Sequence, residues 1–141
     1  MYKRQINAIA NDGFSTDPTL VLGEVKNGKL LSFESNPSTK KLLSKQTTDI
    51  LQSLMISTVE NGTGKTARPE AGGAGGKTAS AETGMKENGK QVVHGWFAGF
   101  YPAENPQYSI VVLAENGKSG SISAAPVFKK IADGIAGLSG R

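Results

Sequence analysis

The apolar positions at the start of the chain recur at helical spacing. Ile6, Ile9 and Ala10 fall on one side of a helix over residues 1–11, a pattern typical of an amphipathic helix. Gly13 follows and can adopt the left-handed backbone conformation that commonly ends a helix. No capping residue precedes this helix. We therefore expect the given sequence to be a piece of a longer chain.

Two further segments have the same periodicity. Ser44 is suited to cap a helix that ends near Asn61. The expected inner face of this helix consists of Ile50, Leu51, Leu54, Met55, Thr58 and Val59. Ser121 or Ser123 is expected to cap a last helix, where Pro126 is tolerated in the first turn. Its apolar face consists of Val127, Phe128, Ile131, Ala132 and Ile135.

Asn27-Gly28 marks a β-hairpin between two apolar runs. Residues 19–25 and 30–34 flank this dipeptide, and Asn-Gly between two such runs is a strong hairpin signal. The pattern predicts a small two-stranded excursion between the first two helices.

Two longer strands are expected in the second half of the chain. Residues 92–101 and 109–115 are apolar on both faces, and the short link 102–106 makes them an antiparallel pair. Strands that are apolar on both faces are covered on both faces, so the predicted helices must supply the cover. The aromatic residues of the first strand are then expected in the core, namely Trp96, Phe97 and Phe100.

A stretch of small residues precedes these strands, from Gly72 to Thr83. If Lys77-Thr78-Ala79 lies on a strand, Lys77 and Ala79 face away from Thr78 and Ser80. A lysine and a hydroxyl on an accessible strand can receive a carboxylate, and unpaired edge amides can stabilise an oxyanion. The alternative is a solvated, glycine-rich edge without a binding role.

These elements predict an α+β fold, in which an antiparallel sheet of three main strands plus a small β-hairpin packs with helices. The 141 residues fit one domain, with a helix, hairpin and helix in residues 1–62 and the Lys77 strand, β-hairpin and last helix in residues 63–141. The net charge of +4 comes from scattered basic residues without interleaved aromatic residues, which argues against nucleic-acid binding.

Several kinds of chemistry are excluded or disfavoured. The chain has no cysteine, so thiolate metal sites, disulfides and cysteine nucleophiles are impossible. Its single histidine, His94, rules out a multi-histidine metal cage and is interpreted as structural, since no nucleophile partner is identifiable. Gly-Lys-Thr occurs at 64–66 and 76–78, but Val59 and Ala71 stand where a phosphate loop requires glycine. We expect no metal and no cofactor.

Five separated blocks, in the same order, resemble the C-terminal part of the transpeptidase domain of penicillin-binding proteins. They cover most of the chain and read Asn61-Gly62-Thr63-Gly64-Lys65, Gly75-Gly76-Lys77-Thr78-Ala79-Ser80-Ala81-Glu82, His94-Gly95-Trp96-Phe97-Ala98-Gly99-Phe100, Ala114-Glu115-Asn116-Gly117 and Ala124-Ala125-Pro126-Val127-Phe128. The resemblance implies a partial transpeptidase or β-lactamase-like fold. It also implies a parent enzyme that crosslinks peptidoglycan stem peptides through a serine acyl-enzyme, outside the cytoplasm at the cell membrane.

The resemblance also implies roles for individual residues. Lys77 and Thr78 would bind the terminal carboxylate of a stem peptide or a β-lactam, and the backbone amide of Ser80 would be one oxyanion donor. Ala79 stands where the family usually has glycine, which affects the expected affinity for β-lactams.

The family's nucleophile is not found in this sequence. In the family the nucleophilic serine lies in a Ser-x-x-Lys motif, and a second motif is Ser-x-Asn. The only Ser-x-x-Lys of this sequence is Ser38-Thr39-Lys40-Lys41, in a polar stretch before the Lys77 strand, and no Ser-x-Asn occurs. We interpret the Ser38 pattern as chance and expect the fragment to be inactive alone. A serine β-lactamase or D,D-carboxypeptidase parent, or a non-catalytic module that binds a peptide carboxylate, remain alternatives.

One expectation concerns the strand at 109–115. In the family fold its far side pairs with a strand that this sequence does not contain. An apolar strand with an unpaired edge tends to find another chain. We therefore expect the isolated fragment to dimerise through this edge, or to cover it with its own residues 1–35.

Overall fold

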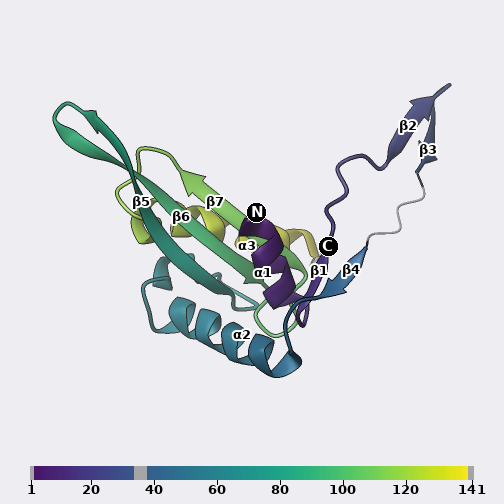
Figure 1. Ribbon diagram of the computed structural model, residues 1–141, viewed down its shortest axis with the longest axis horizontal. Helices are drawn as coiled ribbons and strands as arrows, with labels where there is room; N and C mark the ends of the chain where they lie inside the picture. The colour runs from purple at the N-terminus through teal and green to yellow at the C-terminus, as the bar shows by residue number, and fades with distance from the viewer. Residues whose placement is uncertain (1, 34–37, 140–141) are drawn as a thin grey trace.

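A three-stranded antiparallel sheet forms the centre of the computed structural model, which describes residues 2–33 and 38–139. Its strands are β5 (Gly75–Glu87), β6 (Lys90–Tyr101) and β7 (Tyr108–Ala114), in the order β5-β6-β7. Strands β5 and β7 are therefore the two edges (Figure 1). The predicted strand pair at 92–101 and 109–115 is confirmed, and so is the α+β class.

Helices cover both faces of this sheet, as its apolar strands require. Helix α1 (Tyr2–Ala10) lies in front of β6 and β7 in Figure 1, and α3 (Ala125–Ser139) lies behind them. Helix α2 (Lys45–Glu60) contacts β5 and carries the chain toward it. A short 3₁₀ turn, η1 (Lys65–Ala67), follows α2.

The two faces of the sheet have separate apolar cores. Phe97 is fully buried against α3, with its ring centroid 4.6 Å from that of Phe128, and Phe100 is fully buried against α1 and α2. Both rings are in the core, as predicted. Trp96 is only half-buried, so its predicted place in the core is wrong. It lies on the α1 face of β6, where the helix leaves part of the sheet uncovered.

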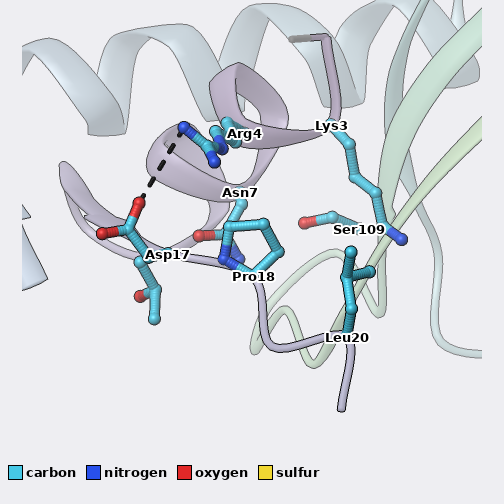
Figure 2. A pocket seen from close by; sticks show the side chains of 8 residues that line it. Lys3, Arg4, Asn7, Asp17, Pro18, Leu20 and Ser109 are labelled. Atoms are coloured by element: carbon cyan, nitrogen blue, oxygen red, sulfur yellow. Dashed lines mark ion pairs between the residues drawn. The ribbon is translucent and has the colours of Figure 1, made fainter. Parts of the chain in front are cut away.

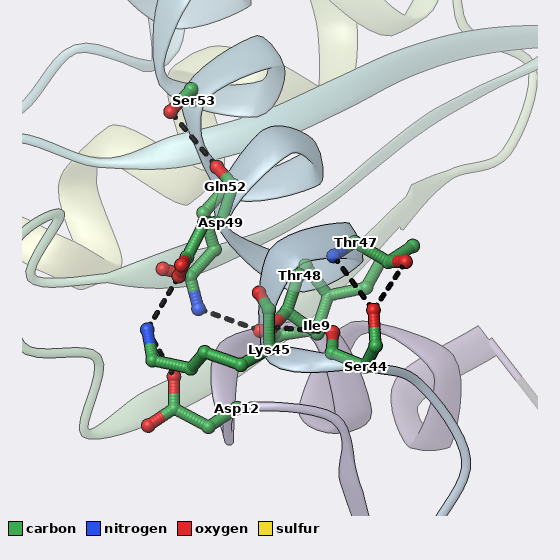
Figure 3. A network of polar contacts seen from close by, with 9 residues as sticks. All are labelled: Ile9, Asp12, Ser44, Lys45, Thr47, Thr48, Asp49, Gln52 and Ser53. Atoms are coloured by element: carbon green, nitrogen blue, oxygen red, sulfur yellow. Dashed lines mark hydrogen bonds and ion pairs between the residues drawn. The ribbon is translucent and has the colours of Figure 1, made fainter.

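Helix α2 begins and ends where the sequence predicts. The Thr47 backbone N–H donates to Ser44 Oγ at 3.1 Å, which is the expected N-cap, and Gln52 Nε2 donates to the Ile9 carbonyl at 2.7 Å (Figure 3). The second bond ties α2 to α1. Lys45 Nζ adds ion pairs with Asp12, which follows α1, and with Asp49 of α2.

The predicted inner face of α2 is partly wrong. Ile50 and Leu54 are 55% and 60% exposed, whereas the buried residues are Thr48, Met55 and Val59. The helix carries two apolar stripes, and only one contacts the sheet. Periodicity alone could not tell which stripe would be buried.

The last helix is preceded by a turn that the sequence did not reveal. A π-helical turn, η2 (Gly120–Ala124), leads into α3, and the Ile122 backbone N–H donates to Ser119 Oγ at 3.2 Å. Ser119 is therefore the cap, and the prediction of Ser121 or Ser123 was wrong. Ser123 Oγ instead accepts a bond from the Lys118 N–H. Val127 and Ile131 of the predicted apolar face are exposed, while Phe128 and Ala132 are buried.

The predicted hairpin is confirmed but is shorter than expected. Strands β2 (Gly23–Lys26) and β3 (Lys29–Ser32) pair around Asn27 and Gly28, which both have positive φ. An additional pair, β1 (Phe14–Thr16) with β4 (Thr39–Lys41), forms its base and was not predicted. The hairpin arm, residues 17–33, projects from the body in Figure 1. Its exposed large apolar side chains are Leu20, Val21, Leu22, Val25, Leu30, Leu31 and Phe33.

Candidate functional site

Two glycines set the position of the candidate strand. A Cβ atom added to Gly75 would lie 2.2 Å from the Phe100 ring, and one added to Gly76 would lie 2.2 Å from the Phe97 ring. Because the two rings occupy opposite faces of the sheet, β5 is clamped between the two cores just before Lys77. The glycines thus have a packing reason, which is close approach of aromatic rings to backbone.

Lys77 and Thr78 lie on β5 directly after these glycines, at the edge of the sheet. Lys77 is exposed, and its Nζ donates to the Thr78 carbonyl at 2.8 Å. Thr78 lies opposite Phe97 in the register, and its Oγ1 is 2.9 Å from Thr63 Oγ1. The structure therefore places a lysine and a hydroxyl on adjacent residues of an accessible edge strand, with the Lys77 Nζ folded back to the Thr78 backbone.

Lys77 and Ala79 face an apolar groove of about 310 Å³ on the α1 side of the sheet. Its lining comes from three strands and one helix, namely Gln5, Ile6, Lys77, Ala79, Ala81, Trp96, Ala98 and Val111. Lys77 supplies the charged group in this lining. Trp96 was assigned to the core from the sequence, yet it forms a wall of this groove.

Ser80 lies on the other face of β5 and is tied to the turn before α3. The Gly120 backbone N–H donates to Ser80 Oγ at 3.3 Å. A Cβ atom on Gly120 would lie 2.4 Å from the Trp96 carbonyl and 2.5 Å from the Ala79 carbonyl, so only glycine lets this turn approach the sheet. Lys77 and Ala79 thus face away from Thr78 and Ser80, as strand alternation predicts.

An ion cluster fixes the loop that leads into β5. Lys129 Nζ lies 2.9 Å from Asp133 Oδ2 and also contacts Glu70 Oε1, while the Glu70 backbone N–H donates to Asp133 Oδ1 at 2.8 Å. This N–H bond, with help from Lys129, lowers the pKa of Asp133 below its ordinary value of 3.8. The bonds to Glu70 and Asp133 raise the pKa of Lys129. Sequence reasoning missed this cluster because Glu70 lies 59 positions from Lys129 in the chain.

The two other candidates from the sequence lie outside the β5 site. His94 Nδ1 accepts a bond from the Asn116 backbone N–H at 3.4 Å, a contact between β6 and the turn after β7 that suits a structural histidine. Thr39–Lys41 of the Ser38 pattern form the exposed strand β4 and are not part of a buried helix. Within residues 2–33 and 38–139, no group of acidic residues and histidine could hold a metal ion.

A larger hollow of about 760 Å³ lies on the other side of α1, near the start of β7 (Figure 2). Its lining includes Asn7, Leu20 and Ser109, and Arg4 Nη1 lies 3.8 Å from Asp17 Oδ1 at its rim. Residues 16–20 thus flank the first residues of β7. In the part of the chain that the structure describes, no strand pairs with the outer edge of β7.

Comparisons with known proteins agree on one family. A family model described as the penicillin binding protein transpeptidase domain matches residues 4–133. The probable peptidoglycan D,D-transpeptidase PenA of Neisseria flavescens is 33% identical over 126 residues, which are 80% of this chain and 31% of PenA. The penicillin-binding protein PbpB of Mycolicibacterium smegmatis is 31% identical over 88% of this chain and 22% of its own length.

Solved structures give the same result. Penicillin-binding protein 3 of Mycobacterium tuberculosis is similar with a TM-score of 0.81 and 28% identity, over 98% of this chain and 34% of that one. The same protein is known in complexes with aztreonam and with ampicillin. The chain spans only 14% to 31% of the lengths of three curated relatives, PenA among them. The sequence match and the edge strand with its Lys77-Thr78 pair lead to one assignment: the chain belongs to the penicillin-binding protein transpeptidase family.

Proposed function

We propose that this chain is the C-terminal part of a peptidoglycan D,D-transpeptidase and supplies the strand that binds the substrate carboxylate. One observation carries the proposal: Lys77 and Thr78 lie together on the open edge of a sheet, in a chain of the transpeptidase family. An ammonium group and a hydroxyl at a strand edge suit a peptide carboxylate or the carboxylate of a β-lactam.

Each residue of the site has a proposed role. Lys77 supplies positive charge beside the groove, and the Thr78 hydroxyl donates to the carboxylate. The backbone amide of Ser80 contributes one oxyanion donor, as expected from its place on an edge strand. Ala79 adds a methyl group to the groove wall where the family usually has glycine.

The fragment alone is proposed to be inactive, because the serine nucleophile belongs to another part of the parent. Incubation with a fluorescent penicillin should give no covalent label on the 141-residue chain, and the full-length parent should be labelled. Replacing Lys77 by Met or Thr78 by Val in the parent should slow labelling. Covalent labelling of the isolated chain would contradict its inactivity, and a parent that is never labelled would contradict the function.

Two alternatives differ in outcome. A serine β-lactamase or carboxypeptidase parent would also form the acyl-enzyme, but water would hydrolyse it and no second stem peptide would be crosslinked. A binding module without chemistry would bind a D-alanyl-D-alanine peptide non-covalently, which a chemical-shift titration of the isolated chain would detect. The relatives PenA and PbpB favour the transpeptidase.

The proposed substrate also implies a location. Peptidoglycan stem peptides are crosslinked outside the cytoplasm, so we place the parent at the outer face of the cell membrane, with a membrane anchor elsewhere in its chain. Among the residues that the structure describes, no helix combines the length and apolarity needed to cross a membrane.

The outer edge of β7 is proposed to pair with a second copy when the fragment is isolated. Among the described residues 14–33 and 38–41, neither short sheet pairs with this edge, and residues 16–20 reach its flank at Ser109. A strand edge without a partner favours association. Sedimentation of the isolated chain tests this: a monomer at all concentrations would contradict it.

A further inference from the structure

The loop after α2 places a second hydroxyl against the candidate site. Thr63 Oγ1 lies 2.9 Å from Thr78 Oγ1, although the two residues are 15 positions apart in sequence. The flanking glycines hold this loop, because the N–H groups of Gly62 and Gly64 donate to the same Thr58 carbonyl at 3.1 and 3.0 Å. Thr63 therefore projects from a backbone that is fixed to the end of α2.

The loop cannot easily shift away from the sheet or toward it. A Cβ atom on Gly64 would lie 3.1 Å from the Thr58 carbonyl oxygen and 3.4 Å from the Phe97 ring, which itself presses on Gly76. The loop, the ring and the candidate strand thus form one packed unit. Packing of this kind holds binding and catalytic side chains in a defined geometry.

The hydroxyl pair has a direction once an anion is present. A hydroxyl donates one hydrogen bond and accepts others, whereas a carboxylate only accepts. When the Thr78 hydroxyl donates a hydrogen bond to a carboxylate, its oxygen is free to accept a hydrogen bond from the Thr63 hydroxyl. Hydrogen bonds in such a chain polarise one another, so the bond from Thr63 strengthens the bond to the anion. The Lys77 ammonium lies 2.8 Å from the Thr78 carbonyl and so adds positive charge at the same strand edge.

We propose that Thr63 is a positioning residue of the carboxylate site, which holds and polarises the Thr78 hydroxyl through their mutual hydrogen bond. This inference rests on the proposed function. It assigns to the loop after α2 a part in recognising the charged end of the substrate, beyond its part in folding.

The test pairs protein variants with ligand variants in the full-length parent protein. The acylation rate constant is measured with a penicillin and with the methyl ester of the same penicillin, which lacks the negative charge. Thr63→Val removes the hydroxyl at nearly constant volume, and Thr63→Ser keeps it. Thr66→Val is the matched control, because Thr66 Oγ1 donates from the same loop to the Ser121 carbonyl and has no bond to Thr78.

Thr63→Val should lower the rate constant for the free acid by about three- to tenfold, the size of one hydrogen bond, and leave the ester unchanged. Thr63→Ser should stay close to wild type with both ligands, and Thr66→Val should not distinguish the two ligands. Equal effects of Thr63→Val on acid and ester, or no effect, would overturn the inference. If Thr63→Val does not fold, Thr63→Ala is measured against the same criterion.

Failure of the function and failure of the inference give different results. If the wild-type parent does not react with the penicillin, the proposed function is wrong and the inference falls with it. If the wild type reacts and Thr63→Val retains the full preference for the acid, only the role of Thr63 is wrong.

Discussion

The substitution Gly76→Ala tests how strongly the aromatic core fixes the candidate strand. Its Cβ would lie 2.2 and 2.5 Å from two atoms of the Phe97 ring, far inside ordinary van der Waals contact of 3.4–4 Å. The ring cannot yield easily, because it is fully buried and packs on Phe128. Strand or ring must therefore shift by about 1 Å.

The magnitude follows from two opposing effects. Overpacking of a core costs about 1–3 kcal/mol. Alanine loses less backbone entropy than glycine on folding, which offsets roughly 0.5–1 kcal/mol. The net destabilisation of Gly76→Ala should be about 1–2 kcal/mol, or about 3–8 °C in the unfolding temperature of a chain of this size.

Thermal unfolding by circular dichroism gives the measurement, and Gly134→Ala is the control. Gly134 lies in α3 with nothing within 4 Å of an added Cβ, so alanine there should stabilise the chain by up to about 1 kcal/mol. Phe97→Leu replaces the obstructing ring by a smaller side chain. The double variant with Gly76→Ala should therefore lose less free energy of unfolding than the sum of the two single variants. A Gly76→Ala variant as stable as wild type, or additive costs in the double variant, would refute the reasoning.

Three further predictions concern the cap, the ion cluster and the groove. Ser44→Ala should lower the free energy of unfolding by about 1 kcal/mol in a urea titration, whereas Ser44→Asp should not, because aspartate also caps helices. Because the pKa of Asp133 in the folded chain lies below 3.8, the ionised carboxylate stabilises the fold above that pH, and this stabilisation is lost as the pH falls further. Asp133→Asn should therefore flatten the decline of the unfolding temperature in this pH range. An unchanged slope would contradict the proposed contribution of Asp133. Ala79→Gly in the full-length parent should raise the penicillin acylation rate by about tenfold, near the lower limit for one methyl group in a fitted pocket, and a slower reaction would show that the methyl does not obstruct the ligand.

Local chemistry made much of the fold predictable. The turn at Asn27-Gly28 and the cap at Ser44 each depend on a few adjacent residues, and both occur where expected. The cap at Ser119 was missed because a π-helical turn shifts the start of the helix, and no side-chain pattern marks such a turn. The stripe of Ile50 and Leu54 was misjudged because burial depends on which neighbours the chain supplies.

The candidate site was predictable only in part. The alternation of Lys77 and Thr78 follows from strand geometry alone. The contact of Thr78 with Thr63 could not be read from the sequence, since it depends on how α2 ends against the sheet. The position of Trp96 could not be read from the sequence either, since its groove exists because helix α1 covers only part of that face of the sheet.

The pairing of β1 with β4 has a consequence for protein engineering. It brings Thr16 and Thr39 side by side, so the two ends of the hairpin arm meet at its base. Replacing the residues between them by a two-residue Asn-Gly turn should shorten the chain without moving the Lys77 strand, since the closure is already made. Such a trimmed protein would lose seven exposed large apolar side chains at once, which should make it easier to purify and crystallise.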